Sequence, residues 1–432
     1  SIRFIVGQPG GVITQFDSVA FTNQDPTLTQ LTVSHPGAAT PFTFTALSFS
    51  TLPGAGRYLA AVDEAPADGQ VLTINMAGAT PSAPPTGLLG TAGGAVINWP
   101  PTAPTPQWTG STNGDWSVGS NWSTGSVPGP TDSVVIPVTA VSPSLSDNFT
   151  VGAVQISGGT LTINGHVLSI ARTLMTSGTG TLTMTNPADL LLVGGNAIFN
   201  GGSTSGLLTA GTLRIAGSFS QLSGSSTQSF AATSPHTVAF LNNNPQIAFA
   251  SPGANASHFG RLSILFGSTA TLGSDVYVAG LLTGSEGASG VIKGTCGKTL
   301  TVQTLSSSGI TFDCISLIVD DPSGTGSGLN ALTFVNQVSG ATQIALIHPG
   351  PSYQLSNVAF NPLAAGAPGL YLTALDFTSG TTPLVVNVVS NNPGNGPAFT
   401  ATSGGAVVIW PTTTATWLGT TSTDFSAGAN WS

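Results

Sequence analysis

Short runs of alternating apolar and hydroxyl side chains recur through the middle of the chain. They include TLTI at 160–163, TLTM at 181–184 and TLTV at 299–302. Successive side chains of a β-strand point to opposite faces, so this alternation predicts strands with one apolar face. Such short runs, separated by Gly, Ser and Asn turns at spacings of about 20 residues, are typical of the stacked rungs of a parallel β-solenoid. An ordinary β-sandwich with many strands is the alternative.

Signals for α-helices are nearly absent. Gly, Pro, Ser and Thr interrupt the chain every few residues, and no apolar stripe with a 3.6-residue period lasts three turns. The sequence therefore predicts an all-β protein.

Residues 1–100 carry longer, aromatic-bearing β-rich runs, such as FTFTALSF and RYLAAVDEA, at spacings of roughly 10–20 residues. Runs of this kind are typical of small antiparallel β-sandwiches. The Pro/Thr-rich stretch PPTAPTPQ follows, directly before Trp108, and such stretches form extended, semi-rigid spacers. We therefore expect a sandwich module joined to the solenoid by a connector.

The sequence repeats itself with a period of about 310 residues. SVAFTN returns as ALTFVN, and the HPG that begins at His35 returns as the HPG that begins at His348. At a nearly constant offset, GGAVINWP returns as GGAVVIWP, and WTGSTNGDWSVGSNWS returns as WLGTTSTDFSAGANWS. Residues 1–123 and 314–432 thus form two copies of one stretch. We expect an array of large units that continues beyond both ends of the sequence.

These patterns divide the chain into five expected segments. They are a sandwich module with its connector, a Trp-rich N-terminal cap of the solenoid, the solenoid, a second sandwich module with its connector, and the start of the next cap. Their bounds are 1–107, 108–145, 146–320, 321–416 and 417–432. The expected fold is all-β, with parallel β-solenoids alternating with small antiparallel β-sandwiches in a tandem repeat.

Charged side chains make up only 5% of the 432 residues, whereas ordinary soluble domains carry about 25%. The formal net charge is −9, from 16 acidic and 7 basic residues. Nucleic-acid binders need Lys and Arg to displace counterions from phosphates, so nucleic acid is excluded as a partner. An uncharged polar surface repels a second copy of itself only weakly, which favours self-association. No apolar run reaches the about 18 residues of a membrane-spanning helix.

The two cysteines, Cys296 and Cys314, enclose one short stretch of the sequence. In an extracellular protein they could form a disulfide, and two buried free thiols are the alternative. Their spacing lacks the further ligands of a zinc site. No metal or cofactor is expected.

Residues 108–137 and the GGTLTINGHVLSIARTLMTSGTGTLTM stretch at 158–184 resemble segments of large secreted bacterial surface proteins. The first resembles a Trp-rich stretch that introduces a β-solenoid, and the second resembles the passenger repeats of autotransporters and filamentous-haemagglutinin-like adhesins. The resemblance covers about residues 110–320. It implies an extracellular solenoid on a bacterial cell surface, although a fold does not fix a function.

A cluster of Trp side chains introduces the expected solenoid. Clustered aromatic rings could stack on sugars and so bind glycans. They could instead plug the open end of the solenoid, where the first rung exposes its core. The plug is favoured, because the second copy replaces one Trp by Phe. The aromatic residues of the two copies are Trp108, Trp116 and Trp122, and Trp417, Phe425 and Trp431.

Polar side chains near these aromatics raise the question of calcium. Asp115 and Asn121 return as Asp424 and Asn430. Calcium loops cluster several acidic residues, so side-chain to backbone bonds of turns are the favoured interpretation.

Catalytic motifs are missing from the sequence. Asp320 and Asp321 form one adjacent acidic pair, and Asp63 with Glu64 forms another, but general acid–base chemistry in a glycan-cleaving solenoid needs converging carboxylates. The first pair has Gly7 and Gln8 as its counterparts in the other copy. No GxSxG, HExxH or phosphate-loop motif occurs, so no catalytic residue is expected.

The expected function is therefore structural: an extracellular, filament- or fibre-forming bacterial surface protein that associates with copies of itself. An adhesin stalk that binds glycans is the alternative, and a polysaccharide-degrading β-helix enzyme is a third, less favoured class.

Overall fold

The structure is a computed structural model that describes most of residues 105–411 and a series of shorter segments between residues 4 and 98. The shorter segments are 4–7, 15–17, 20–21, 27–35, 42–45, 47–49, 57–64, 72–77 and 89–98. The gaps within 105–411 are 242–243, 265–268, 285–289, 307–308, 325, 327, 349–351, 378–381, 390–392 and 394.

The chain divides into two compact units, Ser1–Pro104 and Thr105–Ser432, and each has its own hydrophobic core. The boundary expected between residues 320 and 321 has no counterpart in this division. All pairs of named strands run in parallel. The only helices among the described residues are two 3-10 turns, η1 (Gly119–Asn121) and η2 (Gly396–Phe399).

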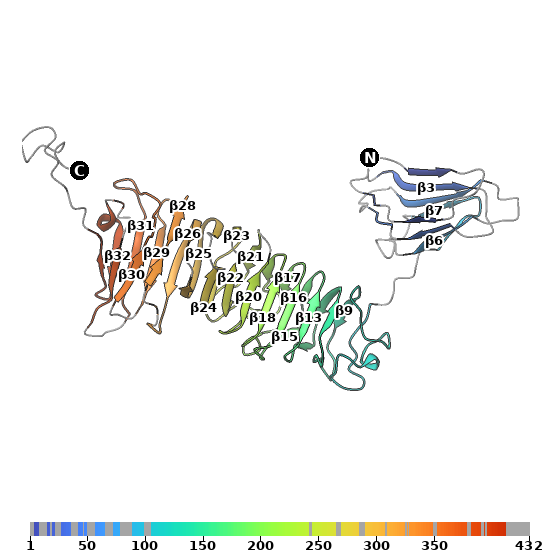
Figure 1. Cartoon of the computed structure of the whole chain (residues 1–432), viewed down its shortest axis with the longest axis horizontal. Helices are drawn as coiled ribbons and strands as arrows, with labels where there is room; N and C mark the ends of the chain where they lie inside the picture. Colours follow the sequence, from blue (N-terminus) through green and yellow to red (C-terminus); the bar gives the residue numbers. More distant parts are fainter. Residues whose placement is uncertain are drawn as a thin grey trace, which may run out of the picture. The chain divides into compact units, whose positions relative to one another are not determined.

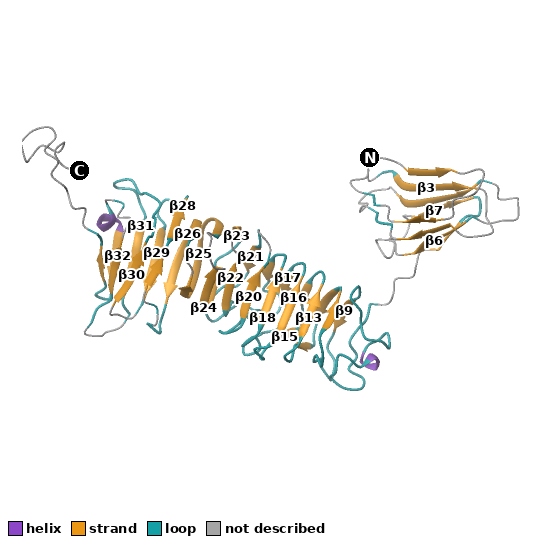
Figure 2. Ribbon diagram, viewed as in Figure 1, coloured by secondary structure: helices purple, strands orange, loops and turns teal. Residues whose placement is uncertain are grey.

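In the C-terminal unit the strands stack into ladders that wind around one core, as in a parallel β-solenoid (Figures 1 and 2). The first ladder contains β10 (Phe149–Val151), β13 (Val167–Ile170), β16 (Leu190–Val193), β18 (Thr212–Ile215), β20 (Thr237–Phe240), β22 (Arg261–Ile264) and β24 (Val276–Gly284). The second contains β9 (Ser133–Ile136), β11 (Ala153–Ile156), β14 (Leu174–Thr176), β17 (Ala197–Phe199), β19 (Phe219–Gln221), β21 (Gln246–Phe249), β23 (Thr269–Leu272), β25 (Val291–Ser306), β26 (Ile310–Asp320) and β28 (Leu332–Val335).

The third ladder starts with the separate pair β12 (Thr160–Thr162) and β15 (Thr181–Thr183), and isolated parallel bridges from Met184 to Leu208 and from Leu208 to Ala232 follow it. The long strands β24, β25 and β26 also contribute to it, and it ends with β29 (Thr342–Ile347), β31 (Leu370–Leu375) and β33 (Thr400–Ser403). A separate sheet beside its last rungs contains β27 (Gly328–Asn330), β30 (Ser352–Ser356), β32 (Val385–Val389) and β34 (Val407–Ile409).

The alternation of side chains explains the register of these ladders. Leu168 pairs with Leu191, and Leu191 pairs with Leu213, and all three are fully buried. A shift of one residue would turn each apolar set toward solvent. The short-strand solenoid predicted for the middle of the chain is therefore confirmed at the level of a parallel, solenoid-like fold.

The antiparallel sandwich expected for the N-terminal unit is wrong. Its strands form two parallel ladders (Figure 1). One contains β1 (Phe4–Gly7), β3 (Thr29–His35), β5 (Arg57–Asp63) and β7 (Leu89–Ala92), and the other contains β2 (Gln15–Asp17), β4 (Phe42–Thr45), β6 (Thr73–Ala77) and β8 (Val96–Asn98). Strands that follow each other in the sequence lie in different ladders, so their short spacing does not mark hairpins.

The second sandwich module, expected within residues 321–416, is corrected in the same way. β29, β31 and β33 continue the third ladder of the solenoid in parallel, and their buried side chains belong to its core. The longer, aromatic-bearing strands of this region are thus wider rungs. Ile344 pairs with Leu372 here, whereas Val154 pairs with Leu174 near the start of the solenoid, so one rung takes up more of the chain in this region.

The two copies of the repeated stretch have the same strand pairing. In the first copy Leu31 pairs with Leu59, and in the second Ile344 pairs with Leu372, so that both partners are shifted by the same number of positions. The pair of Phe44 with Met76 returns as Leu355 with Val388 at nearly the same shift. The sequence repeat therefore coincides with a repeat of ladder register.

A buried aspartate closes the same loop in both copies. Asp63 accepts a hydrogen bond from the Leu72 N–H at 3.0 Å, and Asp376 accepts one from the Leu384 N–H at 2.8 Å. Burying a carboxylate is costly unless it is hydrogen-bonded. Of the acidic pair noted in the sequence, Asp63 therefore has a structural role, because its carboxylate binds the Leu72 N–H.

Candidate functional site

The three predicted Trp residues come together at the start of the solenoid. Trp108, Trp116 and Trp122 are exposed by only 1%, 0% and 2%. Trp122 makes edge-to-face contacts with both of the others, at ring-centroid distances of 5.1 and 4.7 Å, which is a favoured geometry for aromatic pairs. Trp116 also packs against Phe149 of β10, the first strand of a ladder. Their rings thus face the core rather than solvent.

Two of the indole N–H groups fix the cluster to the backbone. Trp108 Nε1 donates to the Val141 carbonyl at 2.7 Å, and Trp122 Nε1 donates to the Trp116 carbonyl at 3.0 Å. The first strand of the second ladder is covered as well, because the Trp108 N–H donates to the Val135 carbonyl at 2.9 Å. The arrangement covers the apolar end of the ladder and satisfies part of its edge.

Asn121, fully buried, organises the loop that carries these Trp residues. Its Oδ1 accepts hydrogen bonds from the N–H groups of Thr112 and Asn113, at 2.8 and 3.1 Å. Its Nδ2 donates to Asn113 Oδ1 at 2.7 Å and to the Asp115 carbonyl at 2.9 Å. All four hydrogen-bonding positions of the amide are therefore used within the loop.

Asp115 accepts hydrogen bonds within its own turn and from a distant serine. Its Oδ1 accepts from Ser146 Oγ at 2.5 Å and from the N–H and hydroxyl of Ser117, both at 2.8 Å. The Ser146 hydroxyl, followed by these Ser117 donors, holds the pKa of Asp115 below its usual value. Among the described residues, no group of three His, Cys, Asp or Glu side chains lies close enough to hold a metal ion.

The second copies of these residues lie outside the described part of the chain. They are Trp417, Phe425, Trp431, Asp424 and Asn430.

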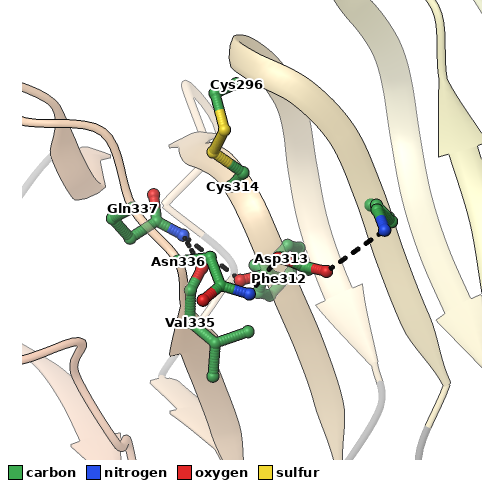
Figure 3. The surroundings of a disulfide bond; sticks show 8 residues. Cys296, Phe312, Asp313, Cys314, Val335, Asn336 and Gln337 are labelled. Atoms are coloured by element: carbon green, nitrogen blue, oxygen red, sulfur yellow. Dashed lines mark hydrogen bonds and ion pairs between the residues drawn. A yellow bond between two sulfur atoms is a disulfide. The ribbon is translucent and has the colours of Figure 1, made fainter.

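Cys296 and Cys314 form a disulfide between β25 and β26 (Figure 3). At this point β25 has four residues, 294–297, opposite Cys314 alone, because the register shifts between Lys293 and Lys298. Cys314 has a positive φ of 60°. The disulfide therefore ties two consecutive rungs where both strands turn a corner.

Polar contacts flank the disulfide on the adjacent rung. Asp313 accepts a hydrogen bond from Asn336 Nδ2 at 2.8 Å (Figure 3). Lys293 Nζ lies 4.0 Å from the other carboxylate oxygen of Asp313. Gln337 Nε2 donates to the carbonyls of Phe312 and Val335, both at 3.2 Å. Three successive rungs are thus linked by side chains next to the covalent bond.

The acidic pair of Asp320 and Asp321 separates into two environments. Asp320 is half-buried; burial raises its pKa, and the neighbouring charge of Asp321 raises it further. Asp321 is buried and accepts hydrogen bonds from Ser323 and from the N–H groups of Gly324 and Gly326. Burial would raise its pKa, but the Ser323 hydroxyl, the Gly326 N–H and the adjacent imidazole of His348 hold it below its usual value. Asp321 thus holds a loop.

Sequence reasoning missed the buried cluster around Asp321. His348 Nε2 lies 3.6 Å from its carboxylate and 2.9 Å from the Gly326 carbonyl. The Tyr353 ring contacts the imidazole edge-on at 5.1 Å, and burial, with the Asp321 charge, raises the pKa of Tyr353. The repeated His-Pro-Gly at His35 and His348 is a sequence signal for the imidazole, and in the structure His35 contacts Phe42 edge-on at 4.7 Å as His348 contacts Tyr353.

Among the described residues, surface hollows occur on the last rungs of the C-terminal unit. The one beside Trp410 and Val407 has a volume of about 430 Å³, a second beside Asn395 and Phe399 has about the same volume, and a third beside Gln354 has about 380 Å³. No acidic, basic, His or Cys side chain lines them. They therefore offer no group for acid–base or nucleophilic chemistry.

Comparison with known proteins gives one match. A family model with the description "Domain of unknown function (DUF8693)" matches residues 107–240, from the residue before Trp108 to the end of β20. No curated protein and no solved structure matches the chain. No helix in the described part of the chain is long and apolar enough to cross a membrane.

Proposed function

We propose that this chain is part of an extracellular, fibre-forming structural protein of a bacterial surface, built from tandem units of about 310 residues and without catalytic activity. One observation carries the proposal. The strands of residues 4–98 and of residues 317–409 have the same ladder register at a nearly constant offset along the sequence. A unit that recurs with the same register is a building block of a series.

Three further features support a structural and extracellular role. With 5% charged residues, copies of the unit repel each other only weakly, so they can pack side by side. A disulfide such as Cys296–Cys314 persists in oxidising compartments. The buried carboxylates Asp63, Asp321 and Asp376 each accept hydrogen bonds from loop N–H groups, so these carboxylates are engaged in holding the fold.

The alternative of a glycan-binding adhesin loses its best candidate site. Sugar rings stack on exposed aromatic faces, and the most exposed of the three described cap indoles, Trp122, is exposed by only 2%. We therefore do not propose glycan binding at the cap.

Electron microscopy of the native material tests the proposal. We expect elongated fibres in which backbone density continues from one unit into the next. Separate particles would contradict it, as would a native species with an intact mass of 43.0 kDa that stays monomeric. In that case the adhesin alternative would gain weight, and a glycan array would be the next measurement.

A further inference from the structure

The outer face of one ladder differs in character between the two copies of the repeated stretch. In the first copy, polar groups occupy this face: the Ser34 hydroxyl donates to the Glu64 carboxylate, and the Arg57 side chain lies over Gly90. In the second copy, apolar side chains occupy the matching positions on and beside β29, β31 and β33. They are Ile347 for Ser34, Phe377 for Glu64, Leu370 for Arg57 and Ala401 for Gly90. The second copy is therefore apolar where the first copy is hydrated.

This apolar face is accessible in the described part of the chain. Phe377 is 47% exposed. Ile318, Ile347 and Leu375, on the outward side of β26, β29 and β31, are half-buried. Exposed apolar side chains that gather on one surface mark interaction sites, whereas scattered ones do not. The face is therefore suited to contact another protein surface.

One carboxylate lies within this face. Asp320 pairs in register with Ile347, and its side chain points to the same side of β26 as Ile318, because alternate residues of a strand share a face. Among the described residues it makes no ion pair and no side-chain hydrogen bond. Burial raises the pKa of Asp320, and the charge of Asp321 raises it further. A basic group placed against Asp320 would relieve this unfavourable setting.

A complementary face lies on the first ladder of the same unit, where β16, β18 and β20 follow one another (Figure 1). Arg214 is exposed and lies in register between Leu192 and Ala239. Leu190 is half-buried on the same outward side. The Arg214 guanidinium also has no ion pair or hydrogen bond among the described residues. A single basic group thus stands among apolar side chains, as Asp320 does with the opposite charge.

The two faces also match in spacing. Both are outer surfaces of parallel ladders, whose strands lie about 4.8 Å apart. On one face Ile347 lies beside Asp320, and on the other Arg214 is flanked by Leu192 and Ala239. When Arg214 lies opposite Asp320, an apolar side chain therefore lies opposite Ile347, whichever way the two ladders run.

We infer that the outer face formed by Asp320, Ile347 and Phe377 binds the Arg214 face of a second copy of this chain, so that units associate side by side. This inference rests on the proposed function, because it names the surfaces through which the units of a structural protein pack.

Sedimentation equilibrium of the full chain tests the inference by charge reversal. We expect the chain to self-associate. Asp320→Arg alone or Arg214→Asp alone weakens the association constant by at least about tenfold, because each change places two like charges opposite each other. The double variant exchanges the two charges, so we expect its association constant to recover to within about threefold of the original.

Asp147→Arg is the matched control, since it makes the same change at an exposed carboxylate near the start of the solenoid. We expect it to leave the association constant unchanged. Phe377→Glu introduces the residue found at the matching position 64, and we expect it to weaken association by about tenfold. Its side chain is exposed, so this variant keeps the fold, and circular dichroism checks the folding of all four proteins.

Three outcomes would overturn the inference. They are a chain that stays monomeric, a double variant that associates as weakly as the single variants, and a control that weakens association as much as Asp320→Arg does. In the last case net charge would govern association rather than this contact.

The result is separable from fibre formation, since it is measured on the chain in solution. Association that follows the exchange of charges, in a native protein without fibres, would keep the contact and contradict the fibre proposal. Fibres of a chain whose association ignores these charges would do the reverse.

Discussion

At the scale of the residue, some buried polar side chains of the C-terminal unit are hydrogen-bonded and at least one is not. Asn121 and Asp321 are buried with several hydrogen bonds each, which offsets the cost of removing them from water. His236 is fully buried, and neither ring nitrogen has a hydrogen-bond partner in the structure. It lies beside Phe230, with ring centroids 6.0 Å apart.

We expect His236 to make the stability of the C-terminal unit depend on pH. Burial lowers its pKa from 6.5 to about 4, because the charged form is disfavoured in an apolar core. Above pH 6.5 the imidazole is neutral in both states and has no effect. As the pH falls toward 4, only the unfolded chain takes up the proton, so stability drops by roughly 3 kcal/mol.

The measurement is urea unfolding of the chain and of His236→Leu at about pH 7.5 and pH 4.5. The carboxylates titrate equally in both proteins, so the difference between them isolates the histidine. Equal losses of stability in the two proteins would contradict the prediction.

Substitution of Trp116 distinguishes the two interpretations of the Trp cluster, an apolar plug of the solenoid end and a surface that binds glycans. If it plugs the core, Trp116→Ala leaves a cavity and costs roughly 3–5 kcal/mol, because the side chain is fully buried. Trp116→Phe introduces the residue found at the matching position 425, and we expect it to cost less than about 2 kcal/mol. Thermal unfolding of both variants checks this order, and equal effects would contradict the plug.

At the scale of the element, the disulfide joins two strands that already share a ladder. Its cysteines have a sequence separation of 18, and a covalent link restricts the unfolded chain more than the folded one. We expect Cys296→Ser with Cys314→Ser to cost roughly 3 kcal/mol and to speed amide exchange in β25 and β26.

Lys293→Ala is the matched control for this pair of changes. It removes the neighbouring ion pair, whose atoms lie 4.0 Å apart with the lysine side chain 55% exposed, and surface pairs of this kind contribute less than about 1 kcal/mol. If the control lost as much stability as the double variant, the disulfide would not be the stabilising element.

The alternation of apolar and hydroxyl residues was sufficient to predict the solenoid rungs of residues 150–320. In TLTI and TLTM, the Leu side chains that the pattern assigned to the core are fully buried. The ladders of residues 1–98 were missed because strands such as FTFT and RYLAAVD alternate in the same way in a sandwich and in a rung. Only the partner strand distinguishes the two folds, and its identity is not a local property of the sequence.

The candidate site was predictable to a similar degree. The grouping of the three Trp residues followed from their proximity in the sequence. A disulfide between Cys296 and Cys314 was one of two interpretations, beside two free thiols, and the structure shows the bond. The contact of His348 with Asp321 did not, since the two residues lie far apart in the sequence and one full rung brings them together. The repeat of His35 at His348 was a signal for the imidazole alone, because the position that matches Asp321 in the first copy is Gln8.

At the scale of the whole molecule, the N-terminal unit shares its parallel ladders with the last rungs of the C-terminal unit. The N-terminal unit has the ladders that end the C-terminal unit, with the same registers. A protein built this way gains length by adding rungs, and each rung contacts only its neighbours. Its stability is therefore distributed along the chain, with local reinforcement at the Trp plug and the disulfide.

The direction of the hydrogen bonds between rungs has a mechanical consequence. These bonds lie along the axis of a solenoid, so a pulling force along that axis loads one rung at a time and peels it from its neighbour. Rungs such as those from Val154 to Leu174 and from Ile344 to Leu372 release roughly 70–100 Å of chain each, at about 3.3–3.6 Å per residue. The Cys296–Cys314 bond keeps the residues between the two cysteines from extending, so peeling at this point releases less chain than it does at rungs without a covalent link.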